Sequence, residues 1–392
     1  MKKVIFQVGI LLLTVSLLYS CKEEEEKKEE LIKDSYTVSG TIKGLDTEFM
    51  TYSYEDETGK RVWDSIFVEN ESFTHSAKII EPTFFFLWPN VESTIKRVQS
   101  GGYYPVKSSQ FAFLASPGDE IEFKGEVTDF INAYPTGTKA NEDLASINRK
   151  IFPLMNESVN YMLEMQFLEE NDTRRIVIQD SIDLLDKQVI DLKKEFVISH
   201  TNSEAAAWYL SDMMLRSHIS DEEAITAFKV FDEQLHDYRY YEDVATRVKG
   251  IEATLIGKTI KNFTTDATFS GETFEFDSLK GKYVLIDFWG TWCGPCIEEM
   301  PTVKDYQEKY ADKLAILGVN QGDTKERIDK FITPKGYDWT HLMDGKGDAN
   351  FVFKFNVAGF PTKFIIDPEG KILHRFVGSG EEAFSVLDEL LK

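Results

Sequence analysis

The chain has 392 residues, of which 42% are hydrophobic and 13% are aromatic. That length can bury a sizeable core and predicts two or three domains, and the aromatic content excludes an extensively disordered chain. Lys and Arg number 44 against 67 Asp and Glu, which gives a formal net charge of −23. Such a surface repels polyanions, so we expect no nucleic-acid partner.

Residues 1–20 are typical of a secretory signal peptide. Two lysines precede an apolar run over residues 4–18, and Ser20 comes directly before Cys21. A basic start, a short apolar core and a small residue at the junction are the marks of such a signal, whereas the run is too short for a membrane span. We therefore expect residues 1–20 to be removed on export.

Cys21 and the residues after it predict how the mature chain is attached. The junction resembles the lipobox of bacterial lipoproteins, which implies a lipidated Cys21 that anchors the chain to a membrane of the cell envelope, in the periplasm or at the outer-membrane surface. The alternative is a plain signal peptide that leaves a free thiol. Residues 21–35 are rich in Glu and Lys and predict an acidic tether, because they have too little apolar surface to fold. They also resemble the acidic export signal of some surface lipoproteins.

Residues 36–135 predict an all-β domain. Val38 and Ile42 alternate with polar neighbours, residues 83–88 indicate a strand buried on both faces, and residues 116–119 indicate a turn. Several short strands separated by turns are typical of a small sandwich or barrel. The pattern resembles an N-terminal β domain of unknown function in secreted bacterial proteins. We find no constellation of catalytic residues here and interpret the aromatic side chains as core.

Residues 136–255 predict an α-helical middle region. Apolar residues recur at intervals of three and four, which is typical of one face of a long helix. This stripe consists of Ile178, Ile182, Leu185, Val189, Leu192 and Phe196. It can pack against other helices of the chain or form a dimer seam, and we favour packing within the chain. Ser220 and Glu223 have the spacing of a capping box that begins a helix.

A pair of cysteines follows an apolar strand predicted for residues 283–291. The next residues are Trp292, Cys293, Gly294, Pro295 and Cys296. The unpaired N–H groups of a helix N-terminus favour negative charge, so we expect Cys293 to be the exposed nucleophile and Cys296, one turn deeper, the resolving thiol. Pro295 suits the first helical turn. A zinc site needs a second ligand pair that the sequence lacks, so we expect no metal and no cofactor.

With these motifs, residues 256–392 resemble the thioredoxin superfamily, and within it the TlpA/ResA-like thiol-disulfide oxidoreductases. The resemblance implies an α/β thioredoxin-like domain. It also implies that Asp287 is the buried carboxylate that assists proton transfer at the resolving cysteine, and that Glu299 lines the site. Which of the two handles the proton stays open. Burial should raise the pKa of Asp287, and Glu299 can also be interpreted as a solvated helix residue.

The loop at Pro361 resembles the cis-proline loop of this family. The resemblance implies a cis Phe360–Pro361 peptide bond, although most X–Pro bonds are trans. It also implies that Pro361 lies against the sulfurs and that the Phe360 backbone pairs with an extended substrate. Trp292, Gly294 and Pro295 complete the expected substrate-binding surface.

The resemblance implies an envelope thiol-disulfide oxidoreductase that works through Cys293 and Cys296. We expect a reductase of protein disulfides, because Gly294-Pro295 matches the pair found in reducing thioredoxins. The implied partners are disulfide-containing client proteins, among them apo-cytochrome c, and a membrane thiol that donates electrons. Two other classes stay open. One is a thiol peroxidase, although its usual Pro-x-x-x-Thr-x-x-Cys surround is absent, and the other is a surface ligand-binding lipoprotein with an accessory redox module.

Overall fold

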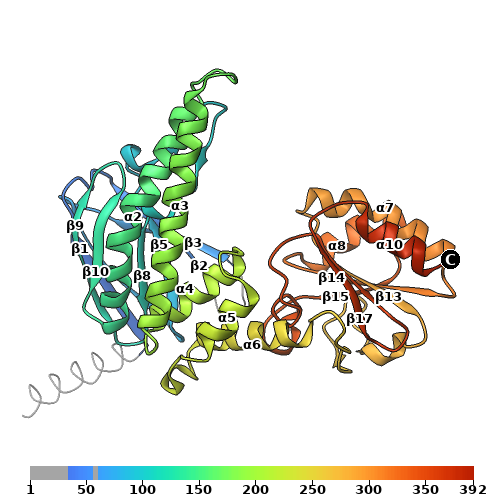
Figure 1. The fold of residues 1–392 in the computed structure, drawn as a ribbon. Coiled ribbons are helices and arrows are strands. Elements are labelled where there is room, and N and C mark those ends of the chain that lie inside the picture. Colours follow the sequence, from blue (N-terminus) through green and yellow to red (C-terminus); the bar gives the residue numbers. More distant parts are fainter. Residues whose placement is uncertain (1–33, 56–60) are drawn as a thin grey trace, which may run out of the picture. The chain divides into compact units, whose positions relative to one another are not determined.

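The computed structural model describes residues 34–55 and 61–392 (Figure 1). The predicted signal peptide, Cys21 and nearly all of the acidic tether lie outside the described residues. The predicted fold class is confirmed, because β strands come first, helices follow, and a mixed α/β domain ends the chain. Within the described ranges, no helix combines the length and the apolar character needed to cross a membrane.

The described chain folds into two compact units. Unit 1 contains the residues up to Tyr209 and residues 232–239, and unit 2 contains residues 210–231 and 240–392. The strands of unit 1 are β1 (Ser35–Thr41), β2 (Phe49–Glu55), β3 (Arg61–Phe67), β4 (Ser72–Lys78), β5 (Thr83–Trp88), β6 (Lys96–Arg97), β7 (Tyr103–Tyr104), β8 (Phe111–Ala115), β9 (Glu120–Val127) and β10 (Ile131–Thr136). Its helices are α2 (Lys139–Met165), α3 (Arg174–Ser199) and the first half of α4 (Glu204–Leu215).

Two four-stranded sheets form a β sandwich in unit 1. One sheet has the strand order β10-β9-β1-β4, and the other has the order β3-β2-β5-β8. Side chains alternate along β1, where Tyr36 and Val38 are buried and Thr37 and Ser39 are partly exposed. Inward side chains of both sheets, such as Val38 of β1 and Phe85 of β5, share one core, which confirms the predicted all-β character.

Helices α2 and α3 pack side by side in unit 1 (Figure 1). The apolar stripe predicted from the sequence is buried along α3, with Ile178, Ile182 and Phe196 among its buried residues. The stripe therefore packs within the chain, as we favoured. In α4, Trp208 stacks on Phe84 of β5 with ring centroids 3.9 Å apart, so this helix covers the face of β5 that points away from the sandwich core.

Unit 2 is built on a five-stranded sheet with the order β15-β14-β13-β16-β17. Strands β13, β14 and β15 run parallel, whereas β16 and β17 pair antiparallel. The strands of unit 2 are β11 (Thr264–Thr265), β12 (Phe274–Glu275), β13 (Tyr283–Trp289), β14 (Leu314–Asn320), β15 (Thr340–Met343), β16 (Thr362–Ile366) and β17 (Ile372–Val377). Its helices are the rest of α4, α5 (Asp221–Phe228), α6 (Arg239–Ala253), α7 (Gly294–Lys309), α8 (Lys325–Ile332), α9 (Phe351–Lys354) and α10 (Glu382–Leu390).

The predicted capping box is present at the start of α5. Glu223 N donates to Ser220 Oγ over 3.2 Å, and Ser220 N donates to Glu223 Oε2 over 2.9 Å. The two residues thus satisfy each other's free N–H groups at the helix start, as the sequence predicted.

The central strand β13 presents a different set of side chains on each face. Leu285 and Trp289 pack into a core cluster with both cysteines and apolar residues of α7, whereas Ile286 and Phe288 belong to the cluster on the opposite face. Because side chains alternate along a strand, Asp287 lies between Leu285 and Trp289 on the face toward α7. The sheet therefore presents one carboxylate to the helix that carries the cysteines.

Candidate functional site

The two cysteines form a disulfide at the N-terminus of α7. Cys293 is the N-cap residue, Pro295 lies in the first turn, and the Cα atoms of Cys293 and Cys296 are 5.3 Å apart. Cys296 N donates to Cys293 Sγ over 3.2 Å, so the sulfur takes one of the unpaired N–H groups at the helix start. The structure thus holds the pair in its oxidised form, with both sulfurs inside one helical turn.

Both sulfurs are buried in this disulfide. Cys293 is 5% exposed and Cys296 is 1% exposed, so the expectation of an exposed Cys293 is wrong for the oxidised form. The reason is packing, because Cys293 belongs to the apolar cluster of Trp289 and Cys296, with the half-buried Phe360 against it. The expected order of depth is nevertheless retained, since Cys296 is the deeper of the two.

The loop before Cys293 is held by the loop that follows β14. Thr291 donates to the Asp323 carboxylate through its backbone N over 2.7 Å and through Oγ1 over 2.6 Å. Asn320 Nδ2 donates to the same carboxylate over 2.9 Å, and Trp292 Nε1 donates to Gln321 O over 2.8 Å. Asp323 is not among the site residues that we predicted from the sequence. The available signal was that two neighbouring parallel strands end together, which brings their following loops into contact.

Trp292 covers this loop and remains half exposed, at 48%. A Cβ at Gly290 would lie 2.4 Å from Trp292 Nε1, so only glycine leaves room for the indole in this position. The indole contacts Phe360 edge-on, with ring centroids 5.1 Å apart. Gly294 and Pro295 are exposed beside it. The expected substrate-binding residues from the two loops therefore meet at one surface.

The Phe360–Pro361 peptide bond is cis, as the resemblance implied. Pro361 is buried, and its carbonyl accepts from Gly378 N over 2.8 Å. Among the described residues, the backbone N–H and C=O of Phe360 have no hydrogen-bonding partner. An extended polypeptide can use these two free groups in the manner of an added β strand.

Asp287 and Glu299 are joined by a lysine that our sequence analysis did not identify. In the register of β13 and β16, Asp287 lies directly opposite Lys363. Lys363 Nζ is 3.3 Å from Asp287 Oδ1 and 2.5 Å from Glu299 Oε2. Glu299 Oε1 also accepts from Gly380 N over 2.9 Å. Glu299 is therefore bound on both oxygens and is not a freely solvated helix residue.

Burial and charge oppose each other in this group. Burial raises the pKa of Asp287, as we expected, and Lys363 acts in the opposite direction. Burial alone would lower the pKa of Lys363, but Asp287 and Glu299 outweigh it and raise that pKa. Lys363 is thus an ammonium ion that is 2% exposed. The sequence signal was one Lys in the apolar strand 362–366, since a lysine is almost never fully buried without a partner.

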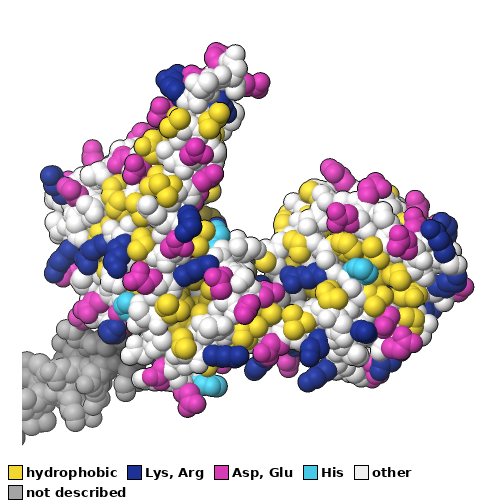
Figure 2. Space-filling view, viewed as in Figure 1, with side chains coloured by type: hydrophobic (Ala, Val, Ile, Leu, Met, Phe, Trp, Pro, Cys, Tyr) yellow, Lys and Arg dark blue, Asp and Glu magenta, His cyan; other side chains and the backbone are white. Residues whose placement is uncertain are grey.

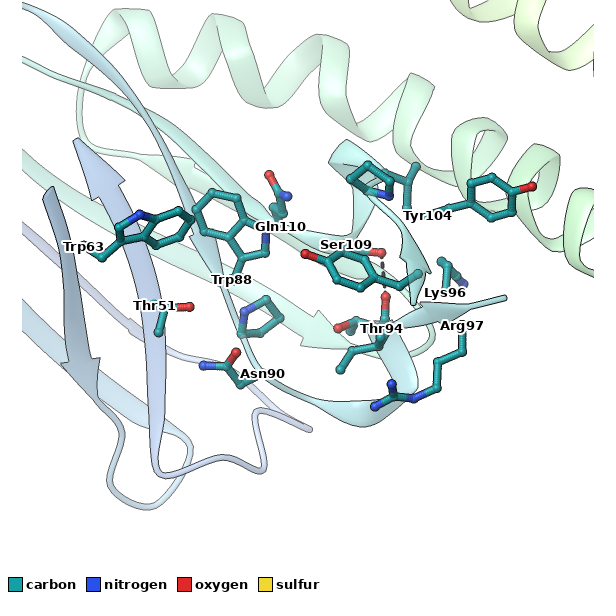
Figure 3. A pocket seen from close by; sticks show the side chains of 15 residues that line it. Thr51, Trp63, Trp88, Asn90, Thr94, Lys96, Arg97, Tyr104, Ser109 and Gln110 are labelled. Atoms are coloured by element: carbon teal, nitrogen blue, oxygen red, sulfur yellow. Dashed lines mark hydrogen bonds between the residues drawn. The ribbon is translucent and has the colours of Figure 1, made fainter. Parts of the chain in front are cut away.

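A second candidate site is a cavity of about 330 Å³ in unit 1 (Figure 3). Trp63 of β3 and Trp88 of β5 lie side by side in it, with ring centroids 5.4 Å apart. Trp63 is 61% exposed and Tyr103 is 57% exposed. These two rings correct our interpretation of the aromatic side chains of this domain as core, because they line a cavity that opens to solvent.

The chain matches two family models. Residues 256–375 match the AhpC/TSA family, and residues 36–144 match a domain of unknown function, DUF4369.

Curated relatives and solved structures also match. The chain is 38% identical over 116 residues to the thioredoxin-like protein YneN of Bacillus subtilis, across 29% of this chain and 66% of that relative. It is 33% identical over 142 residues to the thiol-disulfide oxidoreductase ResA of Bacillus anthracis, across 36% of this chain and 79% of that relative. The thioredoxin domain of a thiol-disulfide oxidoreductase from Bacteroides vulgatus is 26% identical, with a TM-score of 0.32, across 35% of this chain and 99% of that chain.

Proposed function

The chain belongs to the ResA-like thiol-disulfide oxidoreductases of the thioredoxin superfamily, and from this premise we propose that it reduces disulfide bonds of client proteins in a bacterial cell envelope. The observation that carries the proposal is the Cys293–Cys296 disulfide at the start of α7, beside a loop whose Phe360 backbone groups are free. A helix N-terminus favours the thiolate, and a free backbone edge accepts an extended polypeptide.

The proposed reaction passes two electrons from the reduced cysteine pair to the client. The Cys293 thiolate attacks one sulfur of the client disulfide, a mixed disulfide forms, and one client sulfur leaves as a thiolate. The Cys296 sulfur then attacks Cys293, the mixed disulfide breaks, and the second client sulfur leaves with the electron pair of that bond. The enzyme returns to the Cys293–Cys296 disulfide, and the client ends as a dithiol.

The groups around Cys293 position the client in this reaction. An extended client strand pairs with the N–H and C=O of Phe360, and the exposed indole of Trp292 provides apolar contact area beside it. The exposed Gly294 and Pro295 leave the approach to Cys293 open once the disulfide has been reduced. Cys293 is the natural point of attack, because Cys296 lies deeper.

The direction, the partners and the location are also part of this proposal. Reduction is favoured over oxidation because Gly294-Pro295 matches the pair of reducing thioredoxins. A pair of thiols in a membrane protein would reduce the Cys293–Cys296 disulfide to the dithiol and would itself be oxidised to a disulfide. Cysteine pairs of apo-cytochrome c are one candidate client. The sequence at Cys21 supports a lipid anchor in the envelope. A Cys21→Ser variant should leave the membrane fraction and keep its reductase activity in solution.

The cysteine roles are tested by reduction of insulin disulfides with the full chain. Cys293→Ser should abolish reduction, and Cys296→Ser should accumulate a mixed disulfide that is visible on a non-reducing gel. Trapping by Cys293→Ser instead would reverse the assignment of the two roles. A peroxide-consumption assay on the same samples checks the thiol peroxidase alternative, and turnover of peroxide without reduction of insulin would replace the present proposal.

The cavity of unit 1 favours a second candidate function, the binding of a neutral ligand with a flat apolar face. The charged residues at its rim are already paired, Arg97 with Glu92 and Lys96 with Asp129. Gln110 is 8% exposed and lines the cavity, so its side-chain amide is a neutral polar group within reach of a ligand. A ligand that stacks on the indole rings and forms a hydrogen bond with this amide would fit the lining of the cavity.

A saccharide ring has this combination of a flat face and neutral hydroxyl groups. Titration of the full chain with a neutral glucose oligosaccharide should change tryptophan fluorescence. Trp63→Ala should remove the response, whereas Trp339→Phe, which alters a buried indole of unit 2, should keep it. An unchanged response in Trp63→Ala would contradict this second function.

A further inference from the structure

The reaction above gives no part to a buried cluster of unit 2 that consists of Asp287, Glu299 and Lys363. The ammonium ion of Lys363 lies between Asp287 and Glu299, and the side chains of Lys363 and Asp287 are each 3% exposed. Placing a lysine and a carboxylate in an apolar interior is unfavourable unless the two are well paired, and it adds little to stability when they are. Stability therefore does not account for the buried lysine, and its position indicates a role in the reaction.

The strand register places Lys363 on the face of the sheet that α7 covers (Figure 1). Ile365, two residues along β16, belongs to the cluster that contains both cysteines, and side chains two apart share a face. Glu299 comes three residues after Cys296 on α7, so the two side chains are neighbours on the helix surface. The cluster thus lies beneath the first turns of the helix that holds the disulfide.

Few other charged or titratable side chains of the described residues lie near this cluster. Gly318 of β14 lies opposite Asp287 on the other side and brings no side chain. Beyond it, His341 of β15 is buried, and burial lowers its pKa to about 4, so it is neutral. On the side of α10, Lys363 faces the ring of Phe384 at 6.0 Å. Among the described residues, Asp287 and Glu299 are therefore the charges that act on Lys363.

The two contacts of Lys363 are unequal. Glu299 holds the ammonium at 2.5 Å and is itself fixed by Gly380 N. The contact with Asp287 is longer, at 3.3 Å, and Asp287 Oδ1 accepts no well-aligned hydrogen bond. Glu299 thus anchors the lysine, and Asp287 keeps a lone pair that can take a proton.

We propose that Lys363 is a positioning residue: anchored by Glu299, it keeps Asp287 able to accept and release the proton of Cys296. This inference rests on the proposed reductase function. In the resolving step, the Cys296 thiol gives its proton to the Asp287 carboxylate, and its sulfur bonds to Cys293. The bond from Cys293 to the client breaks, and the client sulfur leaves as a thiolate that takes up a proton. Lys363 stays an ammonium ion throughout.

The physical reason is a balance between burial and charge. Burial raises the pKa of Asp287 and so disfavours the carboxylate that accepts a proton. A cation at 3.3 Å stabilises the carboxylate, and an opposite charge at such a distance typically changes a carboxyl pKa by about 1–3 units. The two carboxylates therefore have different parts, with Glu299 as anchor and Asp287 as proton carrier.

The test uses two variants with opposite expected effects on the pH profile of the resolving step in the full chain. Lys363→Met keeps the side-chain length but removes the cation, so the pH of half-maximal rate should rise by about 1–3 units. Glu299→Gln removes the negative charge beside Asp287, and Lys363 then interacts with the charge of Asp287 only. The pH of half-maximal rate should therefore fall. Lys363→Arg should restore the wild-type value, and the exposed Lys249→Met serves as the matched control.

A direct titration complements the kinetics. The carboxyl carbon of Asp287, followed by NMR in the oxidised protein, should shift its midpoint in the same two directions without any turnover. A merely structural lysine would lower stability in Lys363→Met and move neither midpoint. The inference is overturned if Lys363→Met and Glu299→Gln fold but leave the titration midpoint of Asp287 unchanged. It is also overturned if both variants shift that midpoint in the same direction. If the wild-type enzyme does not reduce insulin at all, the proposed function fails instead, and the titration still tests Lys363.

Discussion

The carboxylate of Asp323 should hold the loop that carries Trp292 and Cys293, and Asp323→Ala tests this in depth. Its side chain is fully buried and accepts three hydrogen bonds, two from Thr291 and one from Asn320, at 2.6–2.9 Å. The ion pair with Arg327 at 3.2 Å adds little, because the arginine is 59% exposed.

The expected loss of stability follows from the hydrogen-bond donors that Asp323→Ala leaves without their acceptor. A hydrogen bond to a charged group contributes roughly 1.5–3 kcal/mol, and an unsatisfied buried donor costs about 1–3 kcal/mol. Asn320 is buried and would lose its partner outright, whereas water can partly replace the bonds of Thr291. We therefore expect Asp323→Ala to destabilise unit 2 by about 3–5 kcal/mol, the range typical of breaking a buried charged contact.

A double-mutant cycle with Thr291→Val separates the loop contact from general damage. Thr291→Val removes only the Oγ1 donor, so it should cost about 1–2 kcal/mol alone and much less in the Asp323→Ala background. Urea unfolding provides the free energies, and because two units can unfold separately, hydrogen exchange at Thr291 N provides the local measure. The prediction is refuted if the changes in the free energy of unfolding of the two single variants add up to that of the double variant. It is also refuted if Asp323→Ala lowers the free energy of unfolding by less than about 1 kcal/mol.

Three further predictions concern other buried positions. Burial lowers the pKa of His341 to about 4 from 6.5, so its folded form binds fewer protons, and the free energy of unfolding should fall by about 3 kcal/mol as the pH drops from 6.5 to 4. His341→Gln should flatten this slope in urea titrations. Gly290→Ala places a Cβ 2.4 Å from Trp292 Nε1, so the indole should lose its bond to Gln321 O, with a change in tryptophan fluorescence and slower reduction of insulin. Trp208→Ala removes the ring stacked on Phe84 and should destabilise unit 1 by about 3–5 kcal/mol without lowering the activity of unit 2.

Each of these three has a result that would contradict it. The His341 prediction fails if wild type and His341→Gln lose stability equally over that pH range. The Gly290 prediction fails if Gly290→Ala keeps the wild-type fluorescence and rate. Gly345→Ala is its control, because Gly345 is exposed and a Cβ there would meet only Ala349 Cβ, at 3.5 Å. The Trp208 prediction fails if insulin reduction falls in proportion to stability.

Acidic and basic side chains occur together on one face of the described chain. On the face shown in Figure 2, Asp and Glu side chains are interspersed with Lys and Arg in both units. A client or a donor protein would therefore meet a mixed surface there, and we expect the salt dependence of insulin reduction to be modest.

The sequence by itself determined the parts of this protein that depend on local physics. The period of two in β1, the helical stripe of α3 and the box at Ser220 each describe a segment whose neighbours along the chain fix its structure. The same holds for the cysteines, because two intervening residues at a helix start bring the sulfurs within one turn wherever the helix packs. The cis bond at Pro361 came from the family resemblance and not from the residues themselves.

Only the tertiary structure decided which distant residues complete the site. Asp323 comes 30 residues after Cys293 in the sequence. It reaches the loop before Cys293 because β13 and β14 are parallel neighbours. Lys363 lies opposite Asp287 through the antiparallel register of β13 and β16. The cavity of unit 1 forms where Trp63 and Trp88 come together from two strands that are not paired with each other. Strand order and register are long-range properties, set by which apolar faces bury together, and a local pattern of residues does not contain them.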